Sequence, residues 1–180
     1  MSQKMKTRRI VQLALLIALT VVVQAGGFPQ PVTGPLVNFL LFSTAGLFGI
    51  WPGIILGSVT PIFALLRGQL PAILAPMVPF IILANAALVI CFGVVLKFFS
   101  KKSKKQQIVG QITGIGLSSV VKFLLLTTSA QYIVPFVFGK TFPPPVLMAM
   151  AFPQLITALG GGFLFLMVYH VLSLDKESLS

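Results

Sequence analysis

Long apolar runs alternate along the chain with short segments that carry most of its charges, glycines and prolines. Most of these runs approach the roughly 20 apolar residues that a helix needs to cross a bilayer. Runs of this length are typical of membrane-spanning helices. The pattern predicts helices over about residues 7–25, 35–49, 53–66, 71–99, 108–137 and 145–172.

The interval 35–66 could hold one long helix or two short ones, because only Gly49–Gly53, with the sequence GIWPG, interrupts it. Lys and Arg cluster at residues 4–9 and again at 97–105, and the positive-inside rule places both clusters in the cytoplasm. An even number of crossings must separate them, which two short helices provide. We therefore predict an all-α integral membrane protein, a compact bundle of six transmembrane helices with both termini cytoplasmic and a basic cytoplasmic loop at residues 100–106.

Composition supports lipid as the main solvent of the folded chain. Hydrophobic residues make up 57% of the 180 residues and charged residues only 8%, whereas soluble domains carry about 25% charged residues. We therefore predict a single transmembrane domain over residues 1–180. The first apolar run also resembles the core of a signal peptide, but the rest of the chain is equally apolar, which favours a retained first helix.

The formal net charge of +11 would fit nucleic-acid binding if the cations formed a stripe on a polar surface. They cluster instead at the ends of apolar runs. The sequence therefore predicts a lipid bilayer, and no nucleic acid, as the environment of these charges.

The segment Gly26–Asn38, GGFPQPVTGPLVN, lies between the first two predicted helices on the outer side. Proline lacks the N–H that a helix interior requires, and glycine permits tight turns. We expect an irregular loop over residues 26–35. Two interpretations stay open, a short external turn or a lid over a cavity, and the lid would use Gly27, Pro29, Pro31, Gly34 and Pro35.

Lys122 is the most informative single residue. It lies about 21 Å along the fifth predicted helix, near the middle of the membrane, at 1.5 Å per residue. An unpartnered lysine there costs about 3 kcal/mol or more, and no Asp or Glu lies in any predicted span. Backbone carbonyls, water, loss of its proton or an anionic ligand could each resolve this cost, as could extension of the side chain to an interface.

Other polar residues in the predicted helices are Asn38, Asn85 and Gln154, which either tie helices together or contact a ligand. Arg67, Gln131 and Tyr132 are expected at the outer helix ends. An outward-facing site with cationic edges and a lysine floor suits an organic anion. The predicted substrate-binding residues are Lys122, Asn85, Arg67, Asn38, Gln131, Tyr132 and Gln154.

Catalysis and self-powered transport find little support. The spans lack the carboxylates that proton and sodium coupling commonly use, and one His with one Cys cannot form a metal site. No phosphate-binding loop is present. We predict no enzyme activity, no metal and no cofactor. Ala14 and Ala18, four residues apart, form a small-residue face that either packs within the bundle or receives a partner.

A family resemblance rests on four features of the sequence. They are the six predicted helices, the first outer loop, the Ala14-x-x-x-Ala18 pair and the residue pattern of the run Val32–Ala86. The chain resembles the S component, the substrate-binding membrane subunit, of an energy-coupling factor (ECF) transporter. The resemblance implies high-affinity binding of a vitamin or related micronutrient in the cell membrane of a prokaryote. It also implies a membrane coupling protein (the T component), which would dock at Ala14 and Ala18, and two ABC-type ATPases.

A stand-alone channel or carrier and a non-transporting membrane scaffold remain alternatives. The ligand is also open, with pantothenate, biotin, nicotinate, lipoate, folate, a cobalamin-like compound or an uncharged vitamin as candidates.

Overall fold

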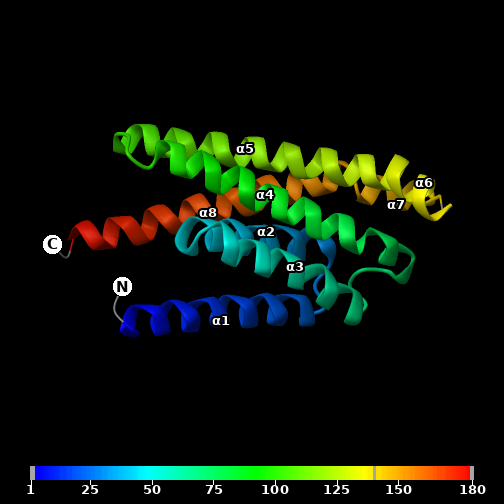
Figure 1. Cartoon of the computed structure of the whole chain (residues 1–180), viewed down its shortest axis with the longest axis horizontal. Coiled ribbons are helices and arrows are strands. Elements are labelled where there is room, and N and C mark those ends of the chain that lie inside the picture. The colour runs from blue at the N-terminus through cyan, green and yellow to red at the C-terminus, as the bar shows by residue number, and fades with distance from the viewer. Residues whose placement is uncertain (1–2, 140, 179–180) are drawn as a thin grey trace.

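The computed structural model describes residues 3–139 and 141–178, and these residues form helices and short connections with no strand. Helices run back and forth along the long axis of the molecule (Figure 1). In chain order the elements are α1 (Gln3–Ala25), α2 (Gln30–Phe48), α3 (Ile50–Leu66), the 3-10 helix η1 (Ala72–Met77), α4 (Val78–Phe99), α5 (Lys104–Thr128), the π-helical turn η2 (Ser129–Ile133), α6 (Val134–Phe138), α7 (Pro144–Ala149) and α8 (Phe152–Ser178).

The six-helix bundle predicted from the apolar runs is present as α1, α2, α3, α4, α5 and α8. Within the described residues, four helical segments are long and apolar enough to cross a bilayer, namely Gln30–Phe48, Ala72–Phe99, Lys104–Phe138 and Pro144–Val171. The helices Ile10–Ala25 and Ile50–Leu66 are apolar but shorter. The chain is therefore a helical membrane protein, with two of its six main helices at the lower limit of spanning length.

The start of α1, the end of α8 and the connection between α4 and α5 lie at the same end of the bundle (Figure 1). An even number of helices therefore separates the start of α1 from this connection, as the charge distribution requires. We name this end the basic end after Lys101–Lys105, and the other end the distal end. The prediction that the basic end faces the cytoplasm rests on the positive-inside rule.

The predicted division of residues 35–66 into two helices is present, but the predicted turn over Gly49–Gly53 is wrong, because α3 begins at Ile50 and only Gly49 separates the two helices. Its φ of 101° lies in the left-handed region, which favours glycine over residues with a Cβ. Its N–H donates to the carbonyls of Thr44 and Ala45 and thereby ends α2, and α3 begins at the next residue. One glycine thus provides the tight turn that returns the chain through the bundle.

The predicted irregular loop over residues 26–35 is wrong over its second half. Helix α2 begins at Gln30, so the connection is only Gly26–Pro29. Pro31 lies in the first turn of α2, where a backbone N–H has no helical partner and its loss costs nothing. Gly34 and Pro35 lie inside the helix, and Pro35 is in its second turn.

Three of the predicted long helices change form near the distal end. Residues 72–77 form the 3-10 helix η1 before α4, the fifth predicted helix passes into η2 and α6, and the sixth is divided into α7 and α8. Pro76 and Pro153 explain two of these changes, because each lacks an N–H and restricts the residue before it. At the basic end α5 instead begins cleanly, since Ser103 and Gln106 form a capping box.

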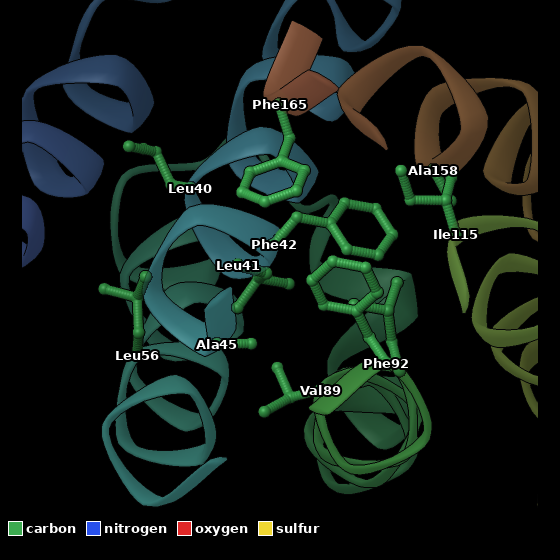
Figure 2. Packing of buried hydrophobic residues seen from close by; sticks show 11 residues of the cluster. Leu40, Leu41, Phe42, Ala45, Leu56, Val89, Phe92, Ile115, Ala158 and Phe165 are labelled. Atoms are coloured by element: carbon green, nitrogen blue, oxygen red, sulfur yellow. The ribbon is translucent and has the colours of Figure 1, made fainter. Parts of the chain in front are cut away.

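Two hydrophobic clusters stabilise the bundle. The first lies toward the basic end, where Phe92 packs edge-to-face against Phe42 and Phe165 at ring-centroid distances of 4.8 and 5.4 Å (Figure 2). It joins α2, α4 and α8. The second lies toward the distal end and contains Leu74, Met77, Leu126, Ala130, Val134, Phe142 and Met150.

Close approach of α2 and α8 depends on Gly161. A Cβ at this position would lie 2.6 Å from the backbone N of Phe39 and from the carbonyl oxygen of Pro35. Backbone atoms cannot move aside as a flexible side chain can, so only glycine fits. A Cβ added at Gly116 on α5 would instead meet no atom within 4 Å, so this second glycine provides a matched control.

We expect Gly161→Ala to lower the thermal unfolding midpoint by about 2–10 °C, because forcing the two helices apart costs about 1–3 kcal/mol. Gly116→Ala should leave the midpoint unchanged or raise it, since alanine favours the helix where space is open. Thermal unfolding of the two purified variants in the same detergent checks this. Equal midpoints would show that α2 and α8 do not pack through Gly161.

Candidate functional site

A cavity of about 380 Å³ opens inside the distal half of the bundle. Residues from α1, α2, α3, α4, α5, α7 and α8 line it, so all six main helices contribute. Its walls are mostly apolar, formed by Val37, Pro61, Ala64, Leu70, Pro71, Leu74, Ile81, Leu126, Pro145, Val146, Ala149 and Met150. This combination of a largely apolar space with a few polar groups is typical of small-molecule sites.

The deep side of the cavity is formed by Lys122, Asn38 and Asn85. The Lys122 ammonium group donates hydrogen bonds of 2.7 Å to Asn38 Oδ1 and of 2.7 Å to Asn85 Oδ1. All three side chains are buried, with exposed fractions of 4%, 2% and 2%. The lysine on α5 is thus fixed between α2 and α4. We name these three residues the lysine clamp.

Backbone contacts fix the orientation of both amides. Asn38 Nδ2 donates to the carbonyl of Gly34 at 2.9 Å. Asn85 Nδ2 donates to the carbonyl of Gly57 at 3.0 Å and to Thr60 Oγ1 at 3.2 Å. With both amide nitrogens occupied in this way, both amide oxygens face the lysine. The clamp therefore connects α2, α3, α4 and α5 through hydrogen bonds.

The clamp leaves part of the Lys122 ammonium group available. An ammonium group carries three N–H donors, and two of them bond the asparagine oxygens. The two acidic residues of the sequence, Asp175 and Glu177, fall near the end of α8, and no Asp or Glu lines the cavity. Two neutral amides solvate the charge without neutralising it. Because Lys122 lines the cavity, the group that completes its coordination can come from a ligand.

Glutamines line the cavity on the distal side of the clamp. Gln24, Gln69 and Gln154 come from the end of α1, the connection after α3 and the start of α8. Gln154 Nε2 donates to the carbonyl of Ala149, which bridges the break between α7 and α8. Gln24 Oε1 and Gln69 Nε2 are buried and have no hydrogen-bond partner in the described structure. Unpaired buried polar atoms are uncommon, and these two belong to side chains that line the cavity.

The structure brings four of the seven predicted substrate-binding residues together. Lys122, Asn38, Asn85 and Gln154 line the cavity. Arg67, Gln131 and Tyr132 are exposed and lie outside it, with Tyr132 68% exposed. The sequence placed these three at the distal helix ends correctly, but it gave no information on which way their side chains point.

The predicted docking and lid residues take different positions relative to the cavity. Ala14 and Ala18 are exposed on α1. Gly27 turns the chain with a φ of 66°, while Pro29 and Pro31 are exposed at the start of α2. Gly34 lines the cavity, and Pro35 is half-buried beside it. The turn Gly26–Pro29 thus lies between two cavity residues, Gln24 and Gln30.

Sequence reasoning missed the contribution of α1 to the cavity. Gln24 follows Thr20 by four residues, so both lie on one helix face, and both are buried. A polar pair at this spacing in an apolar helix was the signal that could have identified the face. Among the described residues, no group of three His, Cys, Asp or Glu side chains could hold a metal ion.

A model of the family described as ECF transporter, substrate-specific component, matches residues 8–173 of the chain. The chain belongs to this family. No curated protein and no solved structure matches it. The resemblance noted in the sequence is therefore confirmed, and the match covers every residue that lines the cavity.

As an S component, the protein is the substrate-specific subunit of a transporter in a prokaryotic cell membrane and acts in transport rather than as an enzyme. Proteins of this family work in a membrane complex with a T component and ATPases. The physical properties of the cavity, namely its burial, its apolar walls and its single clamp, are those expected of a site that binds and releases a small molecule.

The clamp predicts an energetic coupling between Lys122 and Asn85. We expect Asn85→Ala to destabilise the unmodified protein more than it destabilises the Lys122→Met variant. In the unmodified protein the substitution deprives the lysine charge of a buried acceptor, whereas the variant has no charge at that position. The coupling energy in a double-mutant cycle should be about 1–2 kcal/mol. Unfolding free energies measured by denaturant titration in mixed micelles check this. Additive effects would show that the 2.7 Å contact contributes nothing to stability.

Proposed function

We propose that this S component captures a small, singly charged organic anion of vitamin type in the distal cavity. In this proposal Lys122 binds the negative group, the apolar walls bind the body of the molecule, and the glutamines bind its other polar groups. The observation that carries the proposal is the lysine clamp, a buried ammonium group on a cavity wall without a carboxylate partner.

The charge of the cavity supports a monoanion. Lys122 is the one Lys, Arg, Asp or Glu among the residues that line the cavity. At present two neutral amides stabilise this buried charge. A ligand carboxylate would add a charge-assisted hydrogen bond, which is stronger than a bond between neutral groups. A second negative charge on the ligand would find no cation within the cavity.

The size of the cavity supports a compact ligand. Its volume of about 380 Å³ is near the lower end of the roughly 300–1,000 Å³ typical of small-molecule sites. Among the candidates considered from the sequence, pantothenate, biotin, nicotinate and lipoate fit this volume better than folate or a cobalamin-like compound. Each of the four carries a single carboxylate, which matches the single cation.

Import would depend on other proteins. We propose that the T component docks on the exposed face of α1 that carries Ala14 and Ala18, because small residues allow a partner helix to come close. Two ABC-type ATPases bound to the T component would supply the energy. The turn Gly26–Pro29 would act as the gate, since it connects the helix ends that carry Gln24 and Gln30.

We expect Lys122→Gln to weaken binding of the ligand that co-purifies with the protein by about 10–100-fold, because a hydrogen bond to a charged group contributes about 1.5–3 kcal/mol. Glutamine can still donate to an asparagine oxygen, so the fold should persist. Mass spectrometry identifies the retained molecule, and calorimetry with that compound gives the affinities. Arg67→Gln, which removes an exposed cation outside the cavity, is the matched control and should change affinity by less than about twofold.

Unchanged affinity in Lys122→Gln, or retention of an uncharged molecule, would contradict the assignment of the lysine. Sustained uptake by vesicles that contain this subunit alone would contradict the dependence on partners.

We expect Ala18→Leu to reduce the amounts of T component and ATPases that co-purify with the S component, because the larger side chain holds a partner helix away. Ligand retention should not change, since Ala18 lies outside the cavity. Ala75→Leu introduces the same exposed side chain on η1 and serves as the control. Equal recovery of the complex with both variants would exclude the α1 face as the docking surface.

A further inference from the structure

A second hollow lies at the basic end of the bundle, where Ile50, at the turn between α2 and α3, packs against Gly93 of α4. Its volume is about 480 Å³, and it lies away from the substrate cavity, with which it shares no residue. We name it the basic-end groove. It is lined by Ala45, Gly49, Ile50, Trp51, Ile54, Ile90, Gly93 and Lys97.

The groove is amphipathic along its length. Lys97 lies in the last turn of α4 and is exposed, and Lys101 and Lys102 follow it within two turns. Away from this end the walls are aliphatic, with Ile54 on α3 and Ile90 on α4. No acidic residue lines the groove. One end therefore attracts a negative charge, and the rest accommodates a hydrocarbon chain.

Trp51 borders the same groove and is 76% exposed. An exposed tryptophan beside lysines is typical of the level of lipid headgroups, where the ring lies partly in the apolar region and partly in the polar one. The run of lysines and the tryptophan thus place the charged end of the groove at a membrane surface and its aliphatic part within the bilayer.

We propose that the basic-end groove binds one anionic phospholipid. The phosphate group lies at Lys97, and an acyl chain follows the groove between Ile54 and Ile90. Basic pockets between helices at a membrane surface are suited to anionic headgroups, and the lysine is positioned at the charged end of an otherwise apolar channel. The bound lipid would fill a gap between α3 and α4 that the side chains leave open.

The chemistry of the groove favours a lipid over a protein. Stable protein interfaces bury about 800 Å² on each partner and contain polar groups throughout the rim, whereas this groove is lined by eight residues and Lys97 is the one charged residue among them. A phospholipid has the same division into one charged end and one apolar chain. A second copy of the chain or another protein in the groove is therefore an outcome that the experiment must separate.

Trp51 is the sole tryptophan of the sequence, so tryptophan fluorescence reports on the border of the groove. The protein is reconstituted into mixtures of phosphatidylcholine with dibrominated phosphatidylglycerol, or with dibrominated phosphatidylcholine, and quenching of Trp51 is measured at each mole fraction. Bromine quenches at short range, so the two series give the relative binding constant of the anionic lipid. We expect a preference of about fivefold for phosphatidylglycerol, which corresponds to about 1 kcal/mol for one lysine near an anionic surface.

Lys97→Gln should reduce this preference to about one, whereas the matched variant Lys105→Gln, which removes an equal charge outside the groove, should retain it. Because Lys97 is exposed at a helix end, its replacement should not disturb the fold, and circular dichroism checks the helix content. In the unmodified protein, a salt concentration of about 1 M NaCl should also lower the preference, since it shortens the Debye length to about 3 Å.

Three results would overturn the proposal. Equal quenching by the two lipids in the unmodified protein would indicate ordinary surrounding lipid. Equal losses in Lys97→Gln and Lys105→Gln would indicate a general attraction to the basic end. Absence of quenching by either lipid would indicate that protein covers the groove.

Discussion

The hydrogen bonds between Lys122 and the two asparagine oxygens are the interaction on which the rest of the structure depends. A lysine in the middle of a bilayer is costly unless polar groups replace its water. Asn38 and Asn85 do so at 2.7 Å each, and each amide is itself held by a backbone carbonyl. Helices α2, α4 and α5 therefore cannot separate or rotate without exposing a charge to hydrocarbon.

The same interaction divides the bundle into two functional halves. Toward the basic end, Phe42, Phe92 and Phe165 fill the interior. Toward the distal end the clamp is followed by an open space with apolar walls. The charge thus lies between the half that the aromatic side chains fill and the half that contains the cavity. A bound anion would be stabilised by a preformed donor, which reduces the entropy lost on binding.

In the proposed function, this subunit binds its substrate but does not transport it without partners. Uptake against a gradient requires an energy source, and residues 1–174 of the sequence contain no Asp or Glu through which ions could drive transport. Proteins of this family work with a T component and ATPases, which would provide this energy. Helix α1 contributes to both surfaces, because Gln24 lines the cavity while Ala14 and Ala18 are exposed on the outside of the bundle. In the proposed function, binding and docking thus meet on one helix.

Much of the fold could be predicted from the sequence, because apolar run length and the placement of lysines directly reflect the bilayer. Prolines were less informative, since Pro31 and Pro35 are tolerated near a helix start where few N–H groups have partners. The position of Lys122 along its helix was predictable, but its partners were not. Asn38 and Asn85 lie 84 and 37 residues away, and only the packing of α2 and α4 brings them to it. For Arg67, Gln131 and Tyr132 the helix ends were predictable and the side-chain directions were not.

An experimental structure of the protein with its co-purified ligand tests the central claim most directly. The account predicts a single negatively charged group of that ligand within about 3 Å of Lys122 Nζ, with its apolar part against the walls formed by α2, α4 and α7. A ligand bound elsewhere in the bundle, or a neutral group beside a lysine that keeps only its two asparagine contacts, would contradict it.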